Sequence, residues 1–230
     1  MNVITEYKVH DRMLIAVDCI IFGFDGRTLK ALLIKRGFEP ESGNWSLMGG
    51  FVKKDESVEA AAFRVLEVLT GLTNIYLEQL SSFGEVERDP GGRVVSIAYF
   101  ALIKIDDYSA DIMREHNAKW FDIKRIPAMI FDHKKMILMA MDRLQQKVAN
   151  HPIGFELLPE KFTLPQLQNL YEAIYETTFD KRNFSRKILS LHILKKLAEK
   201  EKLLSKKGAF YYTFDRDKYK KLAKEGLKFI

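Results

Sequence analysis

The stretch GGFVKKDESVEAAAFRVLEVLTGL, residues 49–72, carries the strongest fold signal in this chain of 230 residues. From Ser57 onward it is rich in alanine, and its apolar residues follow the 3.6-residue spacing of a helix. Gly71 is typical of a helix end, because glycine adopts left-handed backbone angles without strain. The pattern therefore predicts a helix over residues 57–72.

Apolar segments on both sides of this helix predict β-strands. They are rich in β-branched residues and are bounded by turn sequences, such as GFDGR after the first and DPGGR before the third. The segments are 13–24, 29–37, 94–105 and 118–127. We expect the first two to form a hairpin, and a second helix is predicted over residues 132–149.

The chain changes character after residue 150. Residues 150–162 contain two prolines and a glycine without periodicity, which predicts a linker. Thr163 is a suitable N-cap for a helix that would follow it. The apolar stripe of that helix is Leu164, Leu167, Leu170, Tyr171 and Ile174.

A longer helix is predicted over residues 181–201. Its buried stripe would be Phe184, Ile188, Leu191, Leu194 and Leu197. A hairpin is predicted over residues 203–215, with Lys206 and Lys207 at its tip, followed by a lysine-rich helix. The order helix, turn, helix, hairpin is typical of a winged helix-turn-helix domain.

The formal net charge of +6 is unevenly distributed. Residues 1–150 contain 20 basic and 21 acidic side chains, whereas residues 151–230 contain 17 and 10. The whole positive excess therefore lies in the last third of the chain. This segregation indicates a polyanionic partner for that part, although a solvated, lysine-rich helical surface would also produce it.

The stretch 49–72 resembles the Nudix box, whose pattern is GX5EX7REUXEEXGU. The matching residues are Gly50, Glu56, Arg64, Leu66, Gly71 and Leu72. In that family, glutamates on one helix face hold Mg²⁺ against a diphosphate. The resemblance implies the Nudix fold for this part of the chain.

Three positions depart from the pattern where the family has metal-binding glutamates. Val65, Val68 and Leu69 stand where the family has glutamates. Mg²⁺ needs anionic oxygen ligands, which these side chains lack. Glu67 remains, but one residue is about 100° of rotation on a helix, so it does not replace the acid missing at Val68. We therefore expect no catalytic residue, no bound metal and no cofactor. The competing hypothesis is an active hydrolase whose metal site has moved to Glu85, Glu87 and Asp89.

The start of the predicted helix 181–201 carries side chains suited to DNA. Arg and Asn bind base edges, whereas Lys and Ser bind phosphates. The DNA-binding candidates are Lys181, Arg182, Asn183, Ser185, Arg186, Lys187, Lys206 and Lys207. A small helical bundle with solvated lysines is the alternative, but the helix–helix–hairpin order favours DNA binding.

Both halves together resemble the Nudix-related transcriptional regulators. The segment FTLPQLQNLYEAIYETTFDKRNFSRKIL, residues 162–189, is similar to that family's signature stretch. The resemblance implies an α+β chain, with a Nudix-like α/β/α sandwich around a mixed sheet in residues 1–150 and a winged helix in residues 151–230. It further implies a homodimeric repressor that binds a double-stranded DNA operator and senses ADP-ribose or a pentose. An active hydrolase and a bare interaction module are the other classes that remain open.

The predicted effector site combines charged and aromatic residues. Asp18 lies inside an apolar strand, so it should pair with a base or face a polar pocket. Lys35 and Arg36 could bind sugar hydroxyls or a diphosphate, and Trp45 could stack on a sugar ring. The loss of the metal ligands removes a counter-charge for a diphosphate, which favours a pentose such as L-arabinose and a role in sugar metabolism. With Glu56, these four residues are the ligand-binding candidates.

The remaining sequence features concern the cellular compartment in which the protein is expected. Cys19 is the single cysteine, so no disulfide can form within the chain. The polar start of the chain lacks signal-peptide features, and no apolar run reaches the ~20 residues of a membrane span. We therefore expect a cytoplasmic protein without a membrane partner. The operator, the regulated genes, the direction of regulation and any residual hydrolysis are left open.

Overall fold

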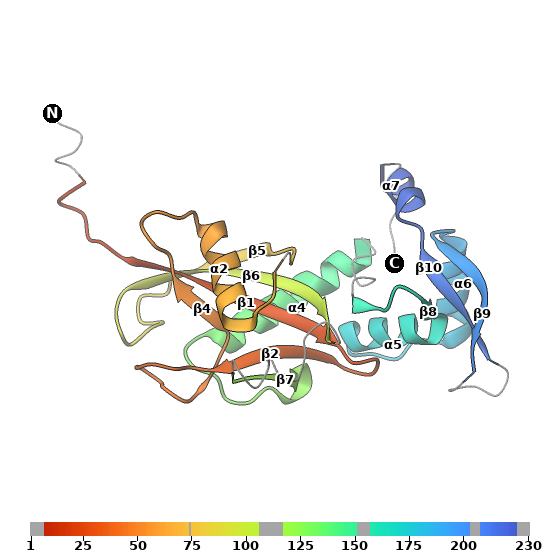
Figure 1. Ribbon diagram of the computed structural model, residues 1–230, viewed down its shortest axis with the longest axis horizontal. Coiled ribbons are helices and arrows are strands. Elements are labelled where there is room, and N and C mark those ends of the chain that lie inside the picture. The colour runs from red at the N-terminus through yellow and green to blue at the C-terminus, as the bar shows by residue number, and fades with distance from the viewer. Residues whose placement is uncertain (1–6, 74, 106–116, 151–156, 203–207, 225–230) are drawn as a thin grey trace.

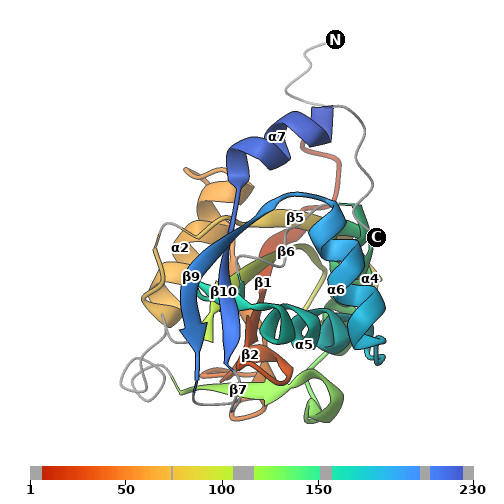
Figure 2. The same cartoon turned by 90° about the vertical axis from the view of Figure 1, so that its right-hand side faces the viewer.

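A computed structural model describes residues 7–73, 75–105, 117–150, 157–202 and 208–224 (Figure 1). Its larger part is a seven-stranded mixed sheet with α2 and α4 on opposite faces. The smaller part lies at the other end of the long axis and consists of short helices beside a small sheet (Figure 2). Among the described helices, none combines the length and hydrophobicity that a membrane crossing requires.

The large sheet is built around β1. Its strands are β1 (Leu14–Phe24), β2 (Leu29–Lys35), β3 (Trp45–Ser46), β4 (Met48–Phe51), β5 (Glu78–Phe83), β6 (Val94–Lys104) and β7 (Ala118–Asp122). β1 pairs antiparallel with β2, as the hairpin prediction required, and parallel with β6. β4 also pairs with β1 and thereby brings Gly49 opposite Asp18.

Alternation along β1 divides the core into two layers. Val17, Cys19 and Ile21 pack toward α2, whereas Ile20 and Phe22 pack toward α4. This is the two-residue period of a strand that is buried on both faces. Asp18 has the parity of Ile20, so its carboxylate lies on the α4 side.

Helix α2 (Val58–Thr70) confirms the helix predicted from the Nudix-box stretch. The Ser57 side chain accepts a hydrogen bond from the Ala60 N–H, which caps the start of the helix. Gly71 ends it with a left-handed backbone (φ 69°). Gly50 lets β4 approach α2 closely, because a Cβ there would lie 2.7 Å from a methyl group of Val65.

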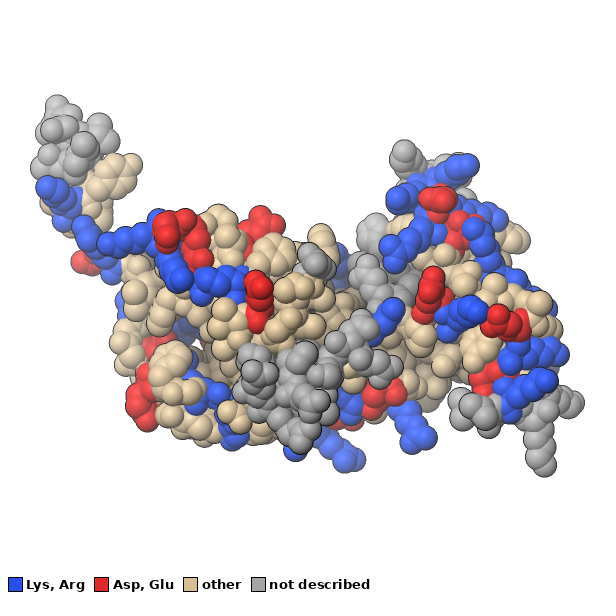
Figure 3. Space-filling view, in the orientation of Figure 1, with Lys and Arg blue, Asp and Glu red and all other residues tan. Residues whose placement is uncertain are grey.

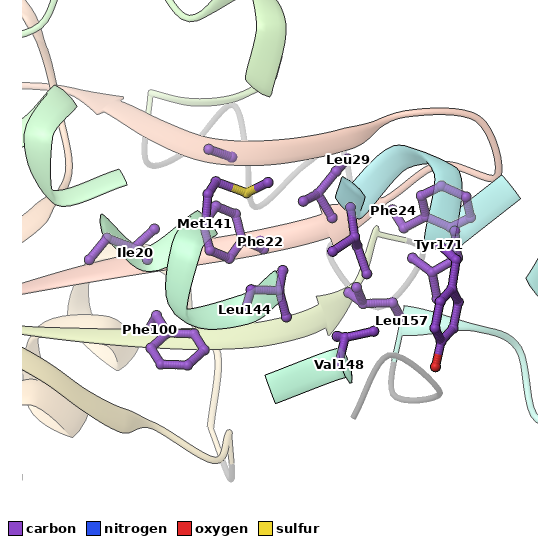
Figure 4. Close-up of a cluster of buried hydrophobic side chains, with 14 of the residues drawn as sticks. Ile20, Phe22, Phe24, Leu29, Phe100, Met141, Leu144, Val148, Leu157 and Tyr171 are labelled. Atoms are coloured by element: carbon purple, nitrogen blue, oxygen red, sulfur yellow. The ribbon is translucent and has the colours of Figure 1, made fainter. Parts of the chain in front are cut away.

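Helix α4 (His133–Asn150) covers the other face of the sheet and follows β7 and the short 3-10 turn η2 (Ile123–Arg125). Its buried apolar side chains are Met136, Ile137, Ala140, Met141, Leu144 and Val148. Figure 4 shows Met141, Leu144 and Val148 packed beside Phe22 and Phe100 of the sheet, with Leu157 and Tyr171 at the far end.

The winged-helix part begins with β8 (Phe162–Thr163) and α5 (Leu164–Tyr175). Thr163 caps α5 as predicted, through a capping box with Gln166. The remaining elements are α6 (Lys181–Ser190), β9 (Leu194–Glu201), β10 (Ala209–Phe214) and α7 (Arg216–Lys224). β10 lies between β8 and β9, so the small sheet has the order β8-β10-β9.

The helix predicted over residues 181–201 is wrong in its second half. α6 ends at Ser190, His192 has a left-handed backbone (φ 57°), and residues 194–201 form β9. The leucine spacing at Leu191, Leu194 and Leu197 suggested a helix, but antiparallel pairing with the aromatic strand β10 decides the structure. The predicted hairpin therefore starts earlier than residue 203, and its tip at 203–207 lies outside the described residues.

One hydrophobic cluster joins the two parts of the molecule. It contains Phe22 of β1 and Leu144 of α4 as well as Tyr171 of α5 and Phe184 of α6. Leu157 and Leu158 belong to it with 2% exposure each, so the last part of the predicted linker is core. The side-chain amide of Asn169 also donates to the carbonyl of Gly26 in the β1–β2 turn.

Candidate functional site

A cavity of about 260 Å³ opens between the start of β1, the ends of β2 and β4, and the start of α4. Its polar lining contains Asp18, Lys35, Arg36, Arg88 and His133. Gly49 and Gly50 form one wall, where a Cβ at Gly49 would collide with the Asp18 carboxylate. The glycines of β4 therefore leave room for Asp18 at the cavity.

Asp18 is the centre of a buried polar cluster beneath the cavity. It is 5% exposed, and one carboxylate oxygen accepts a hydrogen bond from the Ser96 hydroxyl at 2.5 Å. Its oxygens also lie 3.8 Å from Arg88 Nη2 and 3.6 Å from His133 Nε2. The prediction that this residue would be paired or would face a polar pocket is confirmed on both counts.

Arg88 links the cluster to the start of α4. Its Nε and Nη2 donate to the two carboxylate oxygens of Asp132 at 3.0 and 2.7 Å. Such a two-point pair has a fixed geometry, and with Arg88 only 7% exposed it is shielded from water. Burial by itself would lower the pKa of this arginine, but the hydrogen bonds to Asp132 and the nearby negative charges outweigh it and raise the pKa, so Arg88 stays charged.

His133 is buried at the start of α4. Its Nδ1 accepts a hydrogen bond from the Leu47 N–H at 3.1 Å, which leaves the proton on Nε2, facing Asp18. Burial lowers the pKa of His133, and this effect outweighs the attraction of Asp18 for the charged form. Burial thus favours the neutral ring, whose Nε2 faces the carboxylate at 3.6 Å.

The rim of the cavity is formed by two cations, Lys35 and Arg36, and by two aromatic rings, Phe38 and Phe131. The Arg36 guanidinium lies 3.9 Å from the ring centroid of Phe38 and 5.2 Å from that of Phe131. Phe38 is 53% exposed, and Phe131 has a left-handed backbone (φ 49°), which is rare for a bulky residue. This rim offers flat, cationic surfaces to a ligand that enters the cavity.

Two of the predicted ligand-binding residues do not line the cavity. Trp45 packs edge-on against Phe121, with centroids 4.7 Å apart, and the Lys35 ammonium lies 4.3 Å above its ring. Glu56 forms a two-point pair with Arg64 at 2.5 and 2.8 Å. The Arg64 guanidinium, together with the Lys53 N–H, lowers the pKa of Glu56 to about 2. Asp18, Lys35 and Arg36 remain candidates for binding a ligand.

The residues at the Nudix metal positions do not suit a cation. Val65 is 3% exposed and packs into the core beneath α2, Val68 faces solvent, and Leu69 lines the cavity with its apolar side chain. Within the described residues, no three His, Cys, Asp or Glu side chains come close enough to hold a metal ion. Asp89 also lines the cavity, where its carboxylate accepts a hydrogen bond from the Gly91 N–H.

A basic surface covers α6. Phe184 and Ile188 point into the core, which leaves the polar residues of this helix outward. Exposed on it are Lys181, Arg182, Asn183, Arg186 and Lys187, with Ser185 half-buried. Arg186 donates to the Asn183 side chain at 2.8 Å. The space-filling view shows further basic side chains over the winged-helix part, with acidic ones among them (Figure 3). Lys206 and Lys207 lie outside the described residues.

Sequence reasoning missed Arg88, Phe131, Asp132 and His133. Arg88 stands in the acidic, turn-forming segment EVERDPGG, and His133 starts a helix, so neither position suggested a pocket. Both lie far in sequence from Asp18, and only pairing of β6 with β1 and packing of α4 on the sheet bring them to it. The one available signal was Asp18, because a carboxylate inside an apolar strand requires a polar or charged partner.

Family models match both parts of the chain. The NUDIX domain model matches residues 13–139, and the NrtR DNA-binding winged helix domain model matches residues 154–214. A relative from Acinetobacter baylyi, described as an ADPR responsive transcriptional repressor NtrR, is 34% identical over 90% of this chain and 84% of its own length. An ADP-ribose pyrophosphatase from Methanocaldococcus jannaschii is 35% identical over 57% of this chain and 75% of its own length.

Solved structures of Shewanella oneidensis NrtR are also similar. The complex of that protein with a 27mer DNA has a TM-score of 0.77 and 30% identity, covering 90% of this chain and 95% of that one. Its NUDIX domain, solved with ADP ribose, has a TM-score of 0.51 and 30% identity, covering 63% of this chain and 99% of that domain. These similarities extend over both the cavity and the basic helix.

Proposed function

The chain belongs to the Nudix-related transcriptional regulators of the NrtR type, and on that premise we propose that it is an ADP-ribose-responsive repressor that binds double-stranded DNA. The observation that carries the proposal is the combination of two sites in one chain. A Nudix cavity has cations at its rim but apolar side chains at the metal positions, and a separate helix exposes a basic surface. The first suits sensing a ligand without cleaving it, and the second suits DNA.

The DNA-binding site we propose is the outward face of α6. Arg182, Asn183 and Arg186 would contact base edges near the start of the helix, and Lys181, Ser185 and Lys187 would contact phosphates. The hairpin tip with Lys206 and Lys207 would add phosphate contacts beside it. This assignment is supported by the exposure of the α6 cations and by the similarity to the DNA-bound Shewanella protein.

The effector we propose is ADP-ribose rather than the pentose that the sequence favoured. The relatives named for ADP-ribose support this choice, and none of those described above is named for a pentose. Lys35 and Arg36 would supply positive charge to the diphosphate in place of a metal. The cavity volume of about 260 Å³ lies below the ~300–1,000 Å³ of typical ligand sites, so part of the molecule would extend over Phe38 at the rim.

Loss of hydrolysis is part of the same proposal. The Nudix reaction requires carboxylates that hold Mg²⁺, and Val65, Val68 and Leu69 provide none. The alternative, an active hydrolase with relocated ligands, draws on the similarity to an ADP-ribose pyrophosphatase. Glu85 and Glu87 are exposed on the loop before β6, so a relocated site would have to assemble there with Asp89.

We further propose that two copies act together. Two recognition helices must meet half-sites about 34–36 Å apart, which one copy does not provide. Exposed apolar side chains at the start of β1 and on the adjacent β4 support a self-contact. They are Met13 (49% exposed), Leu14 (52%), Ile15 (37%) and Phe51 (43%).

The test is a binding assay with a duplex enriched from a random-sequence pool by the purified protein. We expect tight, salt-sensitive binding that ADP-ribose weakens and L-arabinose leaves unchanged. Incubation of the protein with ADP-ribose and Mg²⁺, followed by chromatography, should show no AMP formed at enzymatic rates. Failure to enrich any duplex would contradict DNA binding, release by arabinose would restore the pentose hypothesis, and rapid AMP formation would support the hydrolase. Sedimentation analysis would show whether the complex contains two copies.

A further inference from the structure

Helix α4 contacts the effector cavity at one end and the winged-helix part at the other. The inference drawn from these two contacts rests on the proposed function. The first turn of the helix lies beneath the effector cavity, and its last turns contact the first helix of the winged-helix part. Between these ends the helix is fixed in the core through side chains from Met136 to Val148. It is therefore a continuous element that connects the cavity to the winged-helix part.

At the cavity end, the connection is ionic. Arg88 and His133 both line the cavity, and Arg88 is held by Asp132, the residue directly before α4. Asp18 lies between them, 3.8 Å from Arg88 and 3.6 Å from His133. A phosphate or ribose group that drew Arg88 toward the cavity would compete with Asp132 and thereby change the position of the helix start.

At the other end, the connection consists of two hydrogen bonds around Gln145. The Gln145 side-chain amide donates to the carbonyl of Ile174 at 2.8 Å, and the Tyr175 hydroxyl donates to the Gln145 carbonyl at 3.0 Å. Ile174 lies in the last turn of α5, where backbone carbonyls have no hydrogen-bond partner within the helix. The Gln145 side chain supplies the missing donor. Burial raises the pKa of Tyr175, which keeps its hydroxyl protonated as a donor.

The contact continues from α5 to the basic helix. Tyr175 lies edge-on to Phe179, with centroids 6.1 Å apart, and Phe179 stacks on Phe184 of α6 at 5.8 Å. The carbonyl of Phe179 accepts from the Gln168 side chain, and its N–H donates to Glu172, so this residue is fixed to α5. A shift at the end of α5 therefore changes the placement of α6.

We propose that Gln145 and Tyr175 are positioning residues that transmit effector binding to the DNA-binding helix. They set the orientation of α5 on α4, and through it the placement of the α6 surface relative to the effector cavity. Their removal should leave each site able to bind its own ligand but should reduce the influence of one site on the other. Coupling between sites in proteins commonly amounts to a change in affinity of about 5–150-fold.

Two substitutions, made singly and together, test this role. Gln145→Met removes the side-chain donor at nearly constant volume, and Tyr175→Phe removes the hydroxyl but keeps the ring that contacts Phe179. Leu138→Ala, at a position of α4 that is 55% exposed, is the matched control on the same helix. For each full-length protein, the dissociation constant of the selected duplex is measured with and without saturating ADP-ribose, and that of ADP-ribose is measured by calorimetry without DNA.

In the wild type and in Leu138→Ala, ADP-ribose should weaken duplex binding to the same extent. In Gln145→Met/Tyr175→Phe, that weakening should fall by at least about threefold, while the affinity for ADP-ribose alone stays within about twofold. Unchanged weakening in the double variant and in both single variants would overturn this inference and leave the proposed function intact. A wild type that binds no duplex or no ADP-ribose would instead contradict the proposed function.

Discussion

The Nudix part and helix α6 of the winged-helix part use their charges in opposite ways. In the first, the main charged groups pair with one another, as Arg88 does with Asp132 and Arg64 with Glu56. In the winged-helix part, Lys161 pairs with Glu199 and Lys195 with Asp215, but the cations of α6 differ. Lys181, Arg182 and Lys187 are exposed, and none reaches a carboxylate within the described residues. Paired charges shape a site, whereas exposed ones of a single sign attract a polyanion.

The same contrast explains why net charge pointed to only one of the two proposed sites. The segment up to residue 150 is almost neutral, yet it contains the most elaborate polar cluster of the described structure around Asp18. The excess of positive charge after residue 150 pointed directly at α6. Burial, rather than the number of charges, thus marks the effector cavity.

The largest effect should follow from Arg88→Ala. This change leaves Asp18 and Asp132 close together without their shared cation, and breaking a buried ion pair costs about 3–5 kcal/mol. Urea denaturation should show a loss of that size in the free energy of unfolding. Lys134→Ala, an exposed neighbour on α4, should change it by no more than about 0.5 kcal/mol. A loss below about 1 kcal/mol for Arg88→Ala would mean that the cluster is more hydrated than the structure indicates.

A smaller effect, confined to DNA, should follow from Arg182→Ala and Arg186→Ala. Each is expected to weaken duplex binding by about 1–3 kcal/mol, as measured by fluorescence anisotropy, with no change in the unfolding transition. Lys54→Ala removes an exposed charge from the Nudix part and should leave duplex affinity unchanged. Equal weakening by all three variants would show that binding depends on total charge and not on α6.

The smallest effect concerns pH. Because burial lowers the pKa of His133 in the folded protein, the unfolded chain binds this proton more readily. The contribution of the neutral ring is thus complete above the unfolded pKa of about 6.5 and decreases as the pH falls below it. His133→Asn keeps an acceptor for the Leu47 N–H and should make stability between pH 7 and pH 5 less dependent on pH. An unchanged slope would indicate that the pKa of His133 is the same in the folded and unfolded protein.

Local patterns were sufficient for most elements but failed where distant pairing decides. The Nudix-box helix follows from alanine content and Gly71, and α5 follows from its cap at Thr163. The segment after Ser190 has helical leucine spacing, and only its pairing with β10 makes it a strand. A single sequence does not reveal that such a partner exists.

The candidate site was predictable to a similar degree. Asp18 stood out because a charge inside an apolar strand needs a partner, and Lys35 and Arg36 follow from their place at a strand end. Trp45 faces Phe121 instead of the cavity, since β7 packs alongside β2 and brings that ring close. Arg88 and His133 reach Asp18 through tertiary packing, for which the sequence holds no local signal.

The hydrophobic cluster that runs from the sheet through α4 into α5 and α6 restricts how this molecule can be divided. Separation of the two parts would expose buried apolar side chains, because Leu144, Leu157 and Tyr171 belong to one cluster that crosses the boundary. Calorimetry should therefore record a single melting transition, and ADP-ribose should protect both parts from heat together. A chimera that takes its winged-helix part from a relative would therefore also need matching residues on α4, where the two parts contact each other.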